Sequence, residues 1–255
     1  MLKALNSSAC GLNAQQLRVD TIANNLANIN TSGYKKLRAN FSELVSQPVK
    51  YTGTPVAESD FDITVGSGVR VAEVSKYFSM GNIIKTGRSL DLAIQGEGFF
   101  RVVRGNEEYY TRDGSFNLDD SGNLVTSNGC VLEGIQLSPG SGRITVSSNG
   151  TVEVEGPEGV SESGQIQLYK FTNLAGLKLE GGNLLSFDNS TGEVVPGIAA
   201  SPGYGMIRQG FLETPNFDLT DEMINLVEAQ RAYGFNARTM RTADEMWSMA
   251  NNLRK

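Results

Sequence analysis

Two short motifs in this sequence contain residue types that could perform acyl transfer. Ser32-Gly33-Tyr34-Lys35 places a hydroxyl three residues before an amine, which is the Ser-x-x-Lys nucleophile pattern of penicillin-recognising enzymes, and Lys85-Thr86-Gly87 matches their strand motif. In that mechanism the serine opens a buried helix beside a strand, with a Ser-x-Asn element between the motifs. Here the serine follows a predicted helix, Gly33 discourages another one, and the two motifs lie close together. We therefore expect no catalytic centre.

Other chemistry is equally sparse. The chain has no histidine, which removes the commonest general base and the commonest metal ligand at neutral pH. Gly96-Glu97-Gly98 weakly resembles a phosphate-binding loop, but no helical pattern follows it, so a bulge or turn is the better interpretation. Cys10 and Cys130 lie 120 residues apart without metal-like spacing and are interpreted as small apolar fillers. We predict no cofactor and no metal.

Composition narrows the class of protein. The 255 residues can bury a core without disulfides. The net charge of -6 and the lack of basic blocks disfavour a nucleic-acid ligand, and nothing indicates a small-molecule substrate. No apolar run reaches the roughly 18 to 20 residues of a membrane span, and the N-terminus lacks the apolar core of a cleavable signal peptide. Export, if it occurs, is expected to use another route.

Both ends of the chain carry helical patterns. Small and apolar residues recur at alternating steps of four and three at Leu5, Ala9, Leu12, Val19, Ala23 and Leu26, and again at Leu219, Met223, Leu226, Tyr233, Ala237, Met240 and Trp247. The first helix should stop near Asn28, before Gly33. The second should begin near Thr220 as its N-cap.

Between these helices the apolar period changes to two. Val69-Arg70-Val71, Ile144-Thr145-Val146 and Val152-Glu153-Val154 alternate, and Asn149-Gly150 sits where a type I′ hairpin turn is expected. The predicted fold class is α+β: long N- and C-terminal helices forming an antiparallel coiled coil, with a central all-β domain of short antiparallel strands. The expected domains are 1–33 with 215–255 for the coiled coil, 34–68 for an extended arm, and 69–214 for the β domain.

This layout has a physical consequence. Two helices alone leave the outward half of each apolar stripe exposed to solvent. Burying apolar surface contributes roughly 25 cal/mol per Å², so contact with neighbouring copies could stabilise these stripes. The alternatives from pattern alone are an ordinary helical hairpin on a globular domain, or a β-rich surface binding module with a helical stalk.

Several separated motifs resemble those of the flagellar basal-body rod and hook protein family. They are Asn24-Asn25-Leu26-Ala27-Asn28 with Thr31-Ser32-Gly33-Tyr34-Lys35, then Leu90–Ile94, Gly96–Phe100 and Tyr110–Phe116, and finally Gln209-Gly210, Glu213-Thr214, Ala229–Tyr233 and Thr242–Met246. They stand in the family's order and cover essentially the whole chain. The length, the Gly66–Arg70 stretch and Ala229–Tyr233 most resemble the distal rod protein, and a proximal rod subunit remains an alternative. The hook protein usually has a longer insertion, which argues against a hook protein.

The resemblance implies a structural subunit of a hollow axial tube. Its implied partners are copies of itself, other flagellar rod and hook proteins, and the flagellar type III export apparatus, and its implied location is the flagellar basal body. Gly234 departs from the helix former that the family more often has. The expected subunit-interface residues are Leu5, Leu12, Val19, Asn24, Asn25, Leu26 and Asn28 in the first helix, and Leu226, Gln230, Arg231, Tyr233, Met240 and Trp247 in the second.

Overall fold

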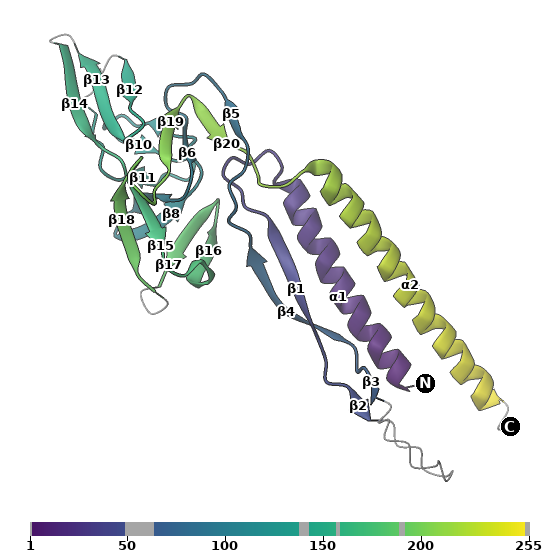
Figure 1. Ribbon diagram of the computed structural model, residues 1–255. Helices are drawn as coiled ribbons and strands as arrows, with labels where there is room; N and C mark the ends of the chain where they lie inside the picture. The colour runs from purple at the N-terminus through teal and green to yellow at the C-terminus, as the bar shows by residue number, and fades with distance from the viewer. Residues whose placement is uncertain (1, 49–63, 138–142, 157–158, 189–191, 253–255) are drawn as a thin grey trace. The chain divides into compact units, whose positions relative to one another are not determined.

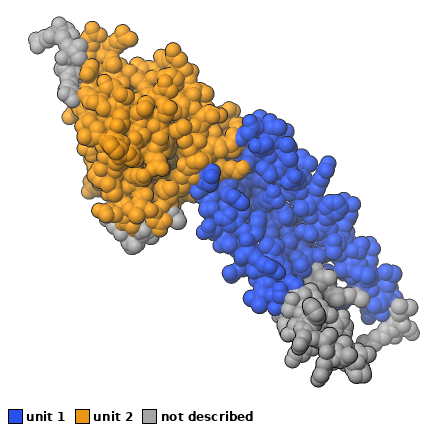
Figure 2. All heavy atoms as spheres, viewed as in Figure 1, with its two compact units in different colours: residues 1–27, 37–77, 218–255 blue, residues 28–36, 78–217 orange. Residues whose placement is uncertain are grey.

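The computed structural model describes residues 2–48, 64–137, 143–156, 159–188 and 192–252 (Figure 1). The chain divides into two compact units (Figure 2). The first contains residues 1–27, 37–77 and 218–255, and the second contains residues 28–36 and 78–217. The chain therefore passes between the units four times, at 27/28, 36/37, 77/78 and 217/218.

The first unit combines two helices with a β ribbon. Its elements are α1 (Leu2–Ala27), β1 (Leu37–Glu43), β2 (Gln47–Pro48), β3 (Thr64–Val65), β4 (Val69–Lys76) and α2 (Leu219–Asn252). β1 pairs with β4 and β2 pairs with β3, both antiparallel. Both termini lie at one end of the helix pair, so α1 and α2 run side by side in opposite directions (Figure 1). Residues 49–63 of the expected arm lie outside the described residues.

The ends of the helices follow local chemistry. α1 ends at Ala27, one residue before the predicted stop at Asn28, and Gly33 adopts a φ of 68° that favours glycine. α2 begins one residue after Asp218, whose carboxylate accepts the Thr220 N–H at 2.7 Å. That bond lowers the pKa of Asp218. Asp218 is therefore the N-cap, and the prediction of Thr220 was wrong.

α1 is covered from two directions. It contacts α2 on one side and the ribbon strands β1 and β4 on another. Its buried side chains are mostly small or polar: Ser8, Ala14, Thr21, Ile22 and Asn25. The ribbon thus supplies cover that the terminal-helix pattern did not reveal.

The predicted antiparallel coiled coil is wrong. A coiled coil would bury the large apolar residues of the repeat, whereas Tyr233, Met240 and Trp247 keep 41%, 37% and 49% of their surface exposed. The buried residues of α2 are instead Glu222, Ala229 and Ala243. The helices approach through small residues, since a Cβ added at Gly11 would lie 2.7 Å from Asn236 Nδ2. Instead of interlocking large side chains, the pair is held by the close approach of α1 to α2 and by the packing of β1 and β4 on α1.

The second unit is built of short antiparallel strands, as predicted. Its largest sheet has the order β16-β17-β8-β7-β11-β10-β9, with β15 pairing with both β7 and β18. Three smaller groups are β12-β13-β14, β19-β6 and β20-β5. The bounds are β5 (Ile83–Lys85), β6 (Leu92–Gln95), β7 (Phe99–Arg104), β8 (Glu107–Thr111), β9 (Asn117–Leu118), β10 (Leu124–Val125), β11 (Val131–Leu132), β12 (Ile144–Val146), β13 (Thr151–Gly156), β14 (Gly159–Gln165), β15 (Gln167–Phe171), the 3₁₀ turn η1 (Leu174–Gly176), β16 (Leu177–Gly181), β17 (Leu184–Phe187), β18 (Val194–Ile198), β19 (Met206–Gln209) and β20 (Phe211–Glu213).

The core of this unit follows from the alternation of its strands. In β7 successive side chains enter different clusters: Phe100 packs edge-on against Phe116, while Phe99 packs against Phe171. The hairpin β12–β13 was predicted correctly, but only Gly150 of its Asn-Gly pair has a positive φ, at 89°, so the turn is not type I′. The α+β composition with a central antiparallel β region is therefore confirmed.

Candidate subunit interface

The apolar residues that α2 leaves exposed form a candidate interface in the first unit. Among the predicted residues, Leu226 is half-buried, Gln230 and Arg231 are exposed, and Tyr233, Met240 and Trp247 are about half exposed. Leu226, Tyr233, Met240 and Trp247 are spaced by seven, so they lie on one strip of the helix. That strip runs four residues after the buried line of Glu222, Ala229 and Ala243.

The sequence interpretation missed a second group of exposed apolar residues on α2. Phe235 is the most exposed aromatic ring of the helix at 62%, and the Arg238 guanidinium lies 5.1 Å above it. The other members of this group are Ile224, Val227, Met246 and Met249, and Leu219 and Met223 of the predicted repeat are exposed as well. A helix with apolar residues on more than one face is stabilised when more than one face is packed against other elements. A test of every helical face, rather than one repeat, could have found these residues.

The predicted residues of α1 divide by environment. Leu5, Leu12, Val19 and Leu26 are half-buried, Asn24 is exposed and Asn25 is buried. The buried positions of α1 include Ser8, Ile22 and Asn25, each one residue before a position of the predicted repeat or three after one. One residue corresponds to about 100° of rotation. The predicted face of α1 is therefore rotated by about 100° from the line of Ser8, Ile22 and Asn25. Asn28 is half-buried and belongs to the second unit.

Asn25 has a structural task inside the first unit. Its Oδ1 accepts the Leu37 N–H at 2.9 Å, and its Nδ2 donates to the Leu37 carbonyl at 2.9 Å and to Glu222 Oε2 at 3.4 Å. One amide thus satisfies both backbone groups at the start of β1 and reaches α2. Only an asparagine side chain offers this donor and acceptor pair at this length.

The second unit contains a buried ionic cluster that the sequence did not indicate. Lys35 Nζ lies 2.5 Å from Glu213 Oε1 and donates to the Ser79 carbonyl at 2.7 Å. Arg112 Nη1 lies 3.3 Å from Glu213 Oε2, and the Gly81 N–H donates to Glu213 Oε1 at 2.8 Å. Burial lowers the pKa of Lys35 and of Arg112, and the Glu213 carboxylate opposes both shifts. These residues lie far apart in the sequence, so a periodic pattern could not predict that they form a cluster.

The Ser-x-x-Lys, Lys-Thr-Gly and Gly-Glu-Gly motifs of the sequence take part in structural contacts and turns. The Lys35 ammonium of the Ser-x-x-Lys motif is held by Glu213 and the Ser79 carbonyl, and Thr86 of the second motif donates to Asp91 Oδ2 at 2.6 Å. Gly96 and Gly98 have φ values of 123° and 133° and join β6 to β7, so the predicted turn is correct. These contacts and backbone angles give Lys35, Thr86, Gly96 and Gly98 structural roles within the second unit.

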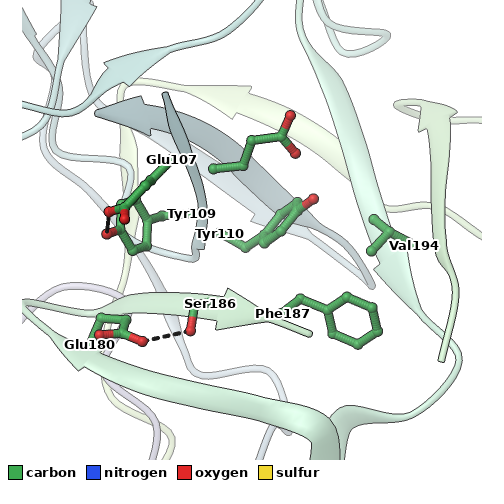
Figure 3. A pocket seen from close by; sticks show the side chains of 8 residues that line it. Glu107, Tyr109, Tyr110, Glu180, Ser186, Phe187 and Val194 are labelled. Carbon is green, nitrogen blue, oxygen red and sulfur yellow. Dashed lines mark hydrogen bonds between the residues drawn. The ribbon is translucent and has the colours of Figure 1, made fainter. Parts of the chain in front are cut away.

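A pocket of about 450 Å³ opens beside β8, β16 and β17 (Figure 3). In Figure 3, Tyr110 lies between Glu107 and Tyr109 on one side and Val194 on the other, and Glu180, Ser186 and Phe187 line the pocket below them. The Tyr109 hydroxyl donates to Glu107, and the Ser186 hydroxyl donates to Glu180 at 2.7 Å. Glu108 lies 3.3 Å from Arg101. The carboxylates of Glu107, Glu108 and Glu180 are therefore each in contact with another side chain of the same unit.

Two further properties concern the described part of the chain. Those residues contain no group of three or more cysteine, aspartate or glutamate side chains that could hold a metal ion. Within the same residues, neither helix is long and apolar enough to cross a membrane.

Comparison with known proteins places these units in a recognised architecture. Residues 5–35 match the flagella basal body rod protein family, residues 93–154 match the flagellar hook protein FlgE/F/G D1 domain, and residues 208–253 match the flagellar basal body rod FlgEFG protein C-terminal family. Proteins described as flagellar basal-body rod protein FlgG are similar over the whole chain. That of Borreliella burgdorferi is 39% identical, with 100% of both chains covered, and that of Caulobacter vibrioides is 37% identical, with 99% of this chain and 100% of the relative covered. The Bacillus subtilis protein is 35% identical, with 100% of both chains covered.

The chain belongs to the flagellar basal-body rod protein family. The matches at residues 5–35 and 208–253 include nearly all of α1 and α2, and the match at 93–154 lies in the second unit. This rod-family chain is therefore a structural subunit of the flagellar basal body. Its assembly with other rod and hook proteins follows from the family, and the alternative of a β-rich surface binding module is set aside.

Proposed function

We propose that this chain polymerises with copies of itself into the hollow distal part of the rod, the shaft that transmits torque from the motor to the hook. It performs no catalysis and binds no cofactor, nucleic acid or small-molecule substrate. It reaches the basal body through the flagellar type III export apparatus. Similarity over the full chain to proteins described as FlgG supports the distal position over a proximal one.

The single observation that carries polymerisation is the row of exposed large side chains on α2. Tyr233, Met240 and Trp247 project from one strip, and each keeps at least 37% of its surface in contact with solvent. Fully burying a side chain of this size contributes roughly 1.5–3 kcal/mol. Covering the strip with a neighbouring copy therefore stabilises an assembly by several kcal/mol per subunit.

The test places a charge on this strip. Met240→Asp should prevent polymer formation, because a carboxylate buried against a neighbour without a partner costs several kcal/mol. The matched control is Met240→Leu, which keeps the apolar surface and should assemble. Sedimentation and electron microscopy of concentrated protein measure assembly, and the melting transition of the second unit checks that the chain is folded. Polymerisation of Met240→Asp at the normal concentration would contradict the proposal.

Trp247 provides an independent readout, because it is the only tryptophan of the chain and is 49% exposed. Its emission should shift to shorter wavelength as the polymer forms. Distal and proximal positions can be separated by cross-linking in purified basal bodies, since a distal subunit should capture hook protein and a proximal one should not.

A further inference from the structure

α2 carries two rows of apolar side chains on opposite sides. The first, which we call the Tyr233 strip, consists of Leu226, Tyr233, Met240 and Trp247. The second, which we call the Phe235 row, consists of Ile224, Phe235 and Met246, spaced by eleven residues or about three turns. Phe235 follows Tyr233 by two residues, and Ile224 precedes Leu226 by two. Two residues correspond to about 200° of rotation, so the Phe235 row lies on the far side of the helix from the Tyr233 strip.

The Phe235 row is open to solvent in a single copy. Ile224, Phe235 and Met246 keep 54%, 62% and 45% of their surface exposed. α1 contacts α2 along buried Ala229 and Ala243, which precede two members of the Tyr233 strip by four residues. α1 therefore borders the Tyr233 strip and lies away from the Phe235 row. A helix with apolar residues on two opposite sides can pack on both only when it lies between two partners.

Two leucines of α1 lie on the same flank of the helix pair as the Tyr233 strip. Leu12 follows Gly11 and Leu26 follows Asn25, and both Gly11 and Asn25 touch α2. One residue corresponds to about 100° of forward rotation, and the Tyr233 strip is rotated forward from the buried line of α2 as well. In an antiparallel pair, forward rotation on either helix leads to the same flank. Half-buried Leu12 and Leu26 therefore extend the apolar surface of the Tyr233 strip onto α1.

The partner that fits the Phe235 row is a second copy of the chain, a step that rests on the proposed function. Copies in an axial polymer point the same way and are not related by a two-fold axis, so each contact joins two different surfaces. Neighbours related by a shift with a small rotation touch through opposite sides of their helices, and the two rows occupy such sides. The rows also match in length, since each spans about 32 Å at 1.5 Å per residue.

We propose that the Phe235 row of each copy packs against the Tyr233 strip and the adjoining leucines of α1 in the next copy. Every copy then contributes both surfaces, so the contact repeats along the assembly and generates a filament. A buried aromatic ring contributes about 150–250 Å², so a row of three side chains buries less than the roughly 800 Å² per partner of a stable complex. The contact therefore forms in a polymer, where each copy makes it twice, and not in an isolated dimer.

Photo-cross-linking identifies the surface that the Phe235 row meets, whatever the axial shift between copies. The variant Phe235→p-benzoylphenylalanine of the full chain is mixed with isotopically labelled wild-type chain, polymerised and irradiated. Mass spectrometry of mixed-label peptide pairs should place the links on α1 or on the Tyr233 strip. The matched control carries the same group at Gln16, an exposed polar position of α1, and should not link to that strip. Links from Phe235 to the Phe235 row of another copy, to β1 or β4, or to the second unit would overturn the contact.

A charge substitution keeps the test decisive if the bulky group impairs assembly. Phe235→Asp should raise the critical concentration for assembly by about tenfold, because a carboxylate buried there has no partner, and Phe235→Leu should change it little. Both should leave the melting of the single chain unchanged, because Phe235 is mostly exposed. Equal critical concentrations of the two variants would contradict the contact. A wild-type chain that stays monomeric at every concentration shows that the proposed function is wrong, whereas wild-type polymers with Phe235 linked elsewhere overturn this contact alone.

Discussion

Lys35 and Glu213 form an ion pair across 178 residues of sequence, with 2.5 Å between Nζ and Oε1 and both side chains almost excluded from solvent. The pair lies within the second unit. Lys35 belongs to the short segment 28–36 that follows α1 in sequence, and Glu213 ends β20 just before the chain leaves for α2. The Gly33 N–H also donates to the Glu213 carbonyl at 2.8 Å. The ion pair and this backbone bond thus fasten two of the chain's connections together.

Glu213→Gln should destabilise the second unit strongly. It leaves Lys35 and Arg112 buried without their counter-charge, and breaking a buried pair in this way costs about 3–5 kcal/mol. Urea denaturation followed by circular dichroism measures the loss. The matched control is Glu97→Gln, which removes the exposed partner of Lys170 and should change stability little. Equal stability of the two variants would show that the cluster is unimportant to the fold.

Asp113→Asn should alter the pH dependence of stability. Burial raises the pKa of Asp113 above its ordinary value of 3.8, even though the Ser115 N–H and hydroxyl donate to Oδ1 at 3.0 and 2.8 Å. The folded state therefore holds a proton that the unfolded state releases, so stability is lost as the pH rises from 3.8 through the folded pKa. The asparagine variant lacks this loss.

The measurement is the free energy of unfolding of both proteins between about pH 3 and pH 7. The difference between Asp113→Asn and wild type should move in favour of the variant as the pH rises. A constant difference across this range would refute a raised pKa at Asp113.

Gly234→Ala should stabilise the helices. No atom lies within 4 Å of the Cβ that it would add, and an interior glycine costs about 0.5–1 kcal/mol relative to alanine. Thermal melting of the helical signal should report a gain of that size. The control is Gly11→Ala, whose Cβ would meet Asn236 at 2.7 Å and should therefore gain less. An equal gain at both positions would contradict the close approach of α1 and α2.

Asn25→Asp should weaken the first unit. The variant loses the N–H donors to the Leu37 carbonyl and to Glu222, and it places two carboxylates close together. A buried acceptor left without its donor costs about 1–3 kcal/mol. Hydrogen exchange at β1 reports the loss, and lower pH should lessen it by protonating the new acid. Asn24→Asp is the control, because Asn24 is exposed; a comparable effect there would exclude a specific role for Asn25.

Sequence reasoning found the terminal helices and the antiparallel β region because these depend on local periodicity and turn chemistry. α1 ends within one residue of its predicted stop, and β12–β13 flank the predicted Asn149-Gly150 turn. The residues through which the two helices contact each other could not be predicted from the sequence. Apolar spacing shows which faces need cover, but not that β1 and β4 would cover α1 or that Ala229 and Ala243 would meet it.

The candidate site shows the same division. The repeat led to Tyr233, Met240 and Trp247, whose interface role stays a prediction, but it passed over Phe235 on another face. The partners of Lys35 could not be inferred, because a pair separated by 178 residues leaves no periodic signal. Asn25 was selected by resemblance, and its bonds to Leu37 became visible only when β1 was placed beside α1.

The division of the first unit between both ends of the chain determines when it can form. The ribosome delivers α1 first, yet its contact partner α2 comprises 34 residues at the far end of the sequence. A nascent chain therefore carries an incomplete helical unit for most of its synthesis, while the strands between can begin to pair. The surfaces of α2 follow the strands in the sequence, so association through α2 cannot begin before the strands between the two helices have been made.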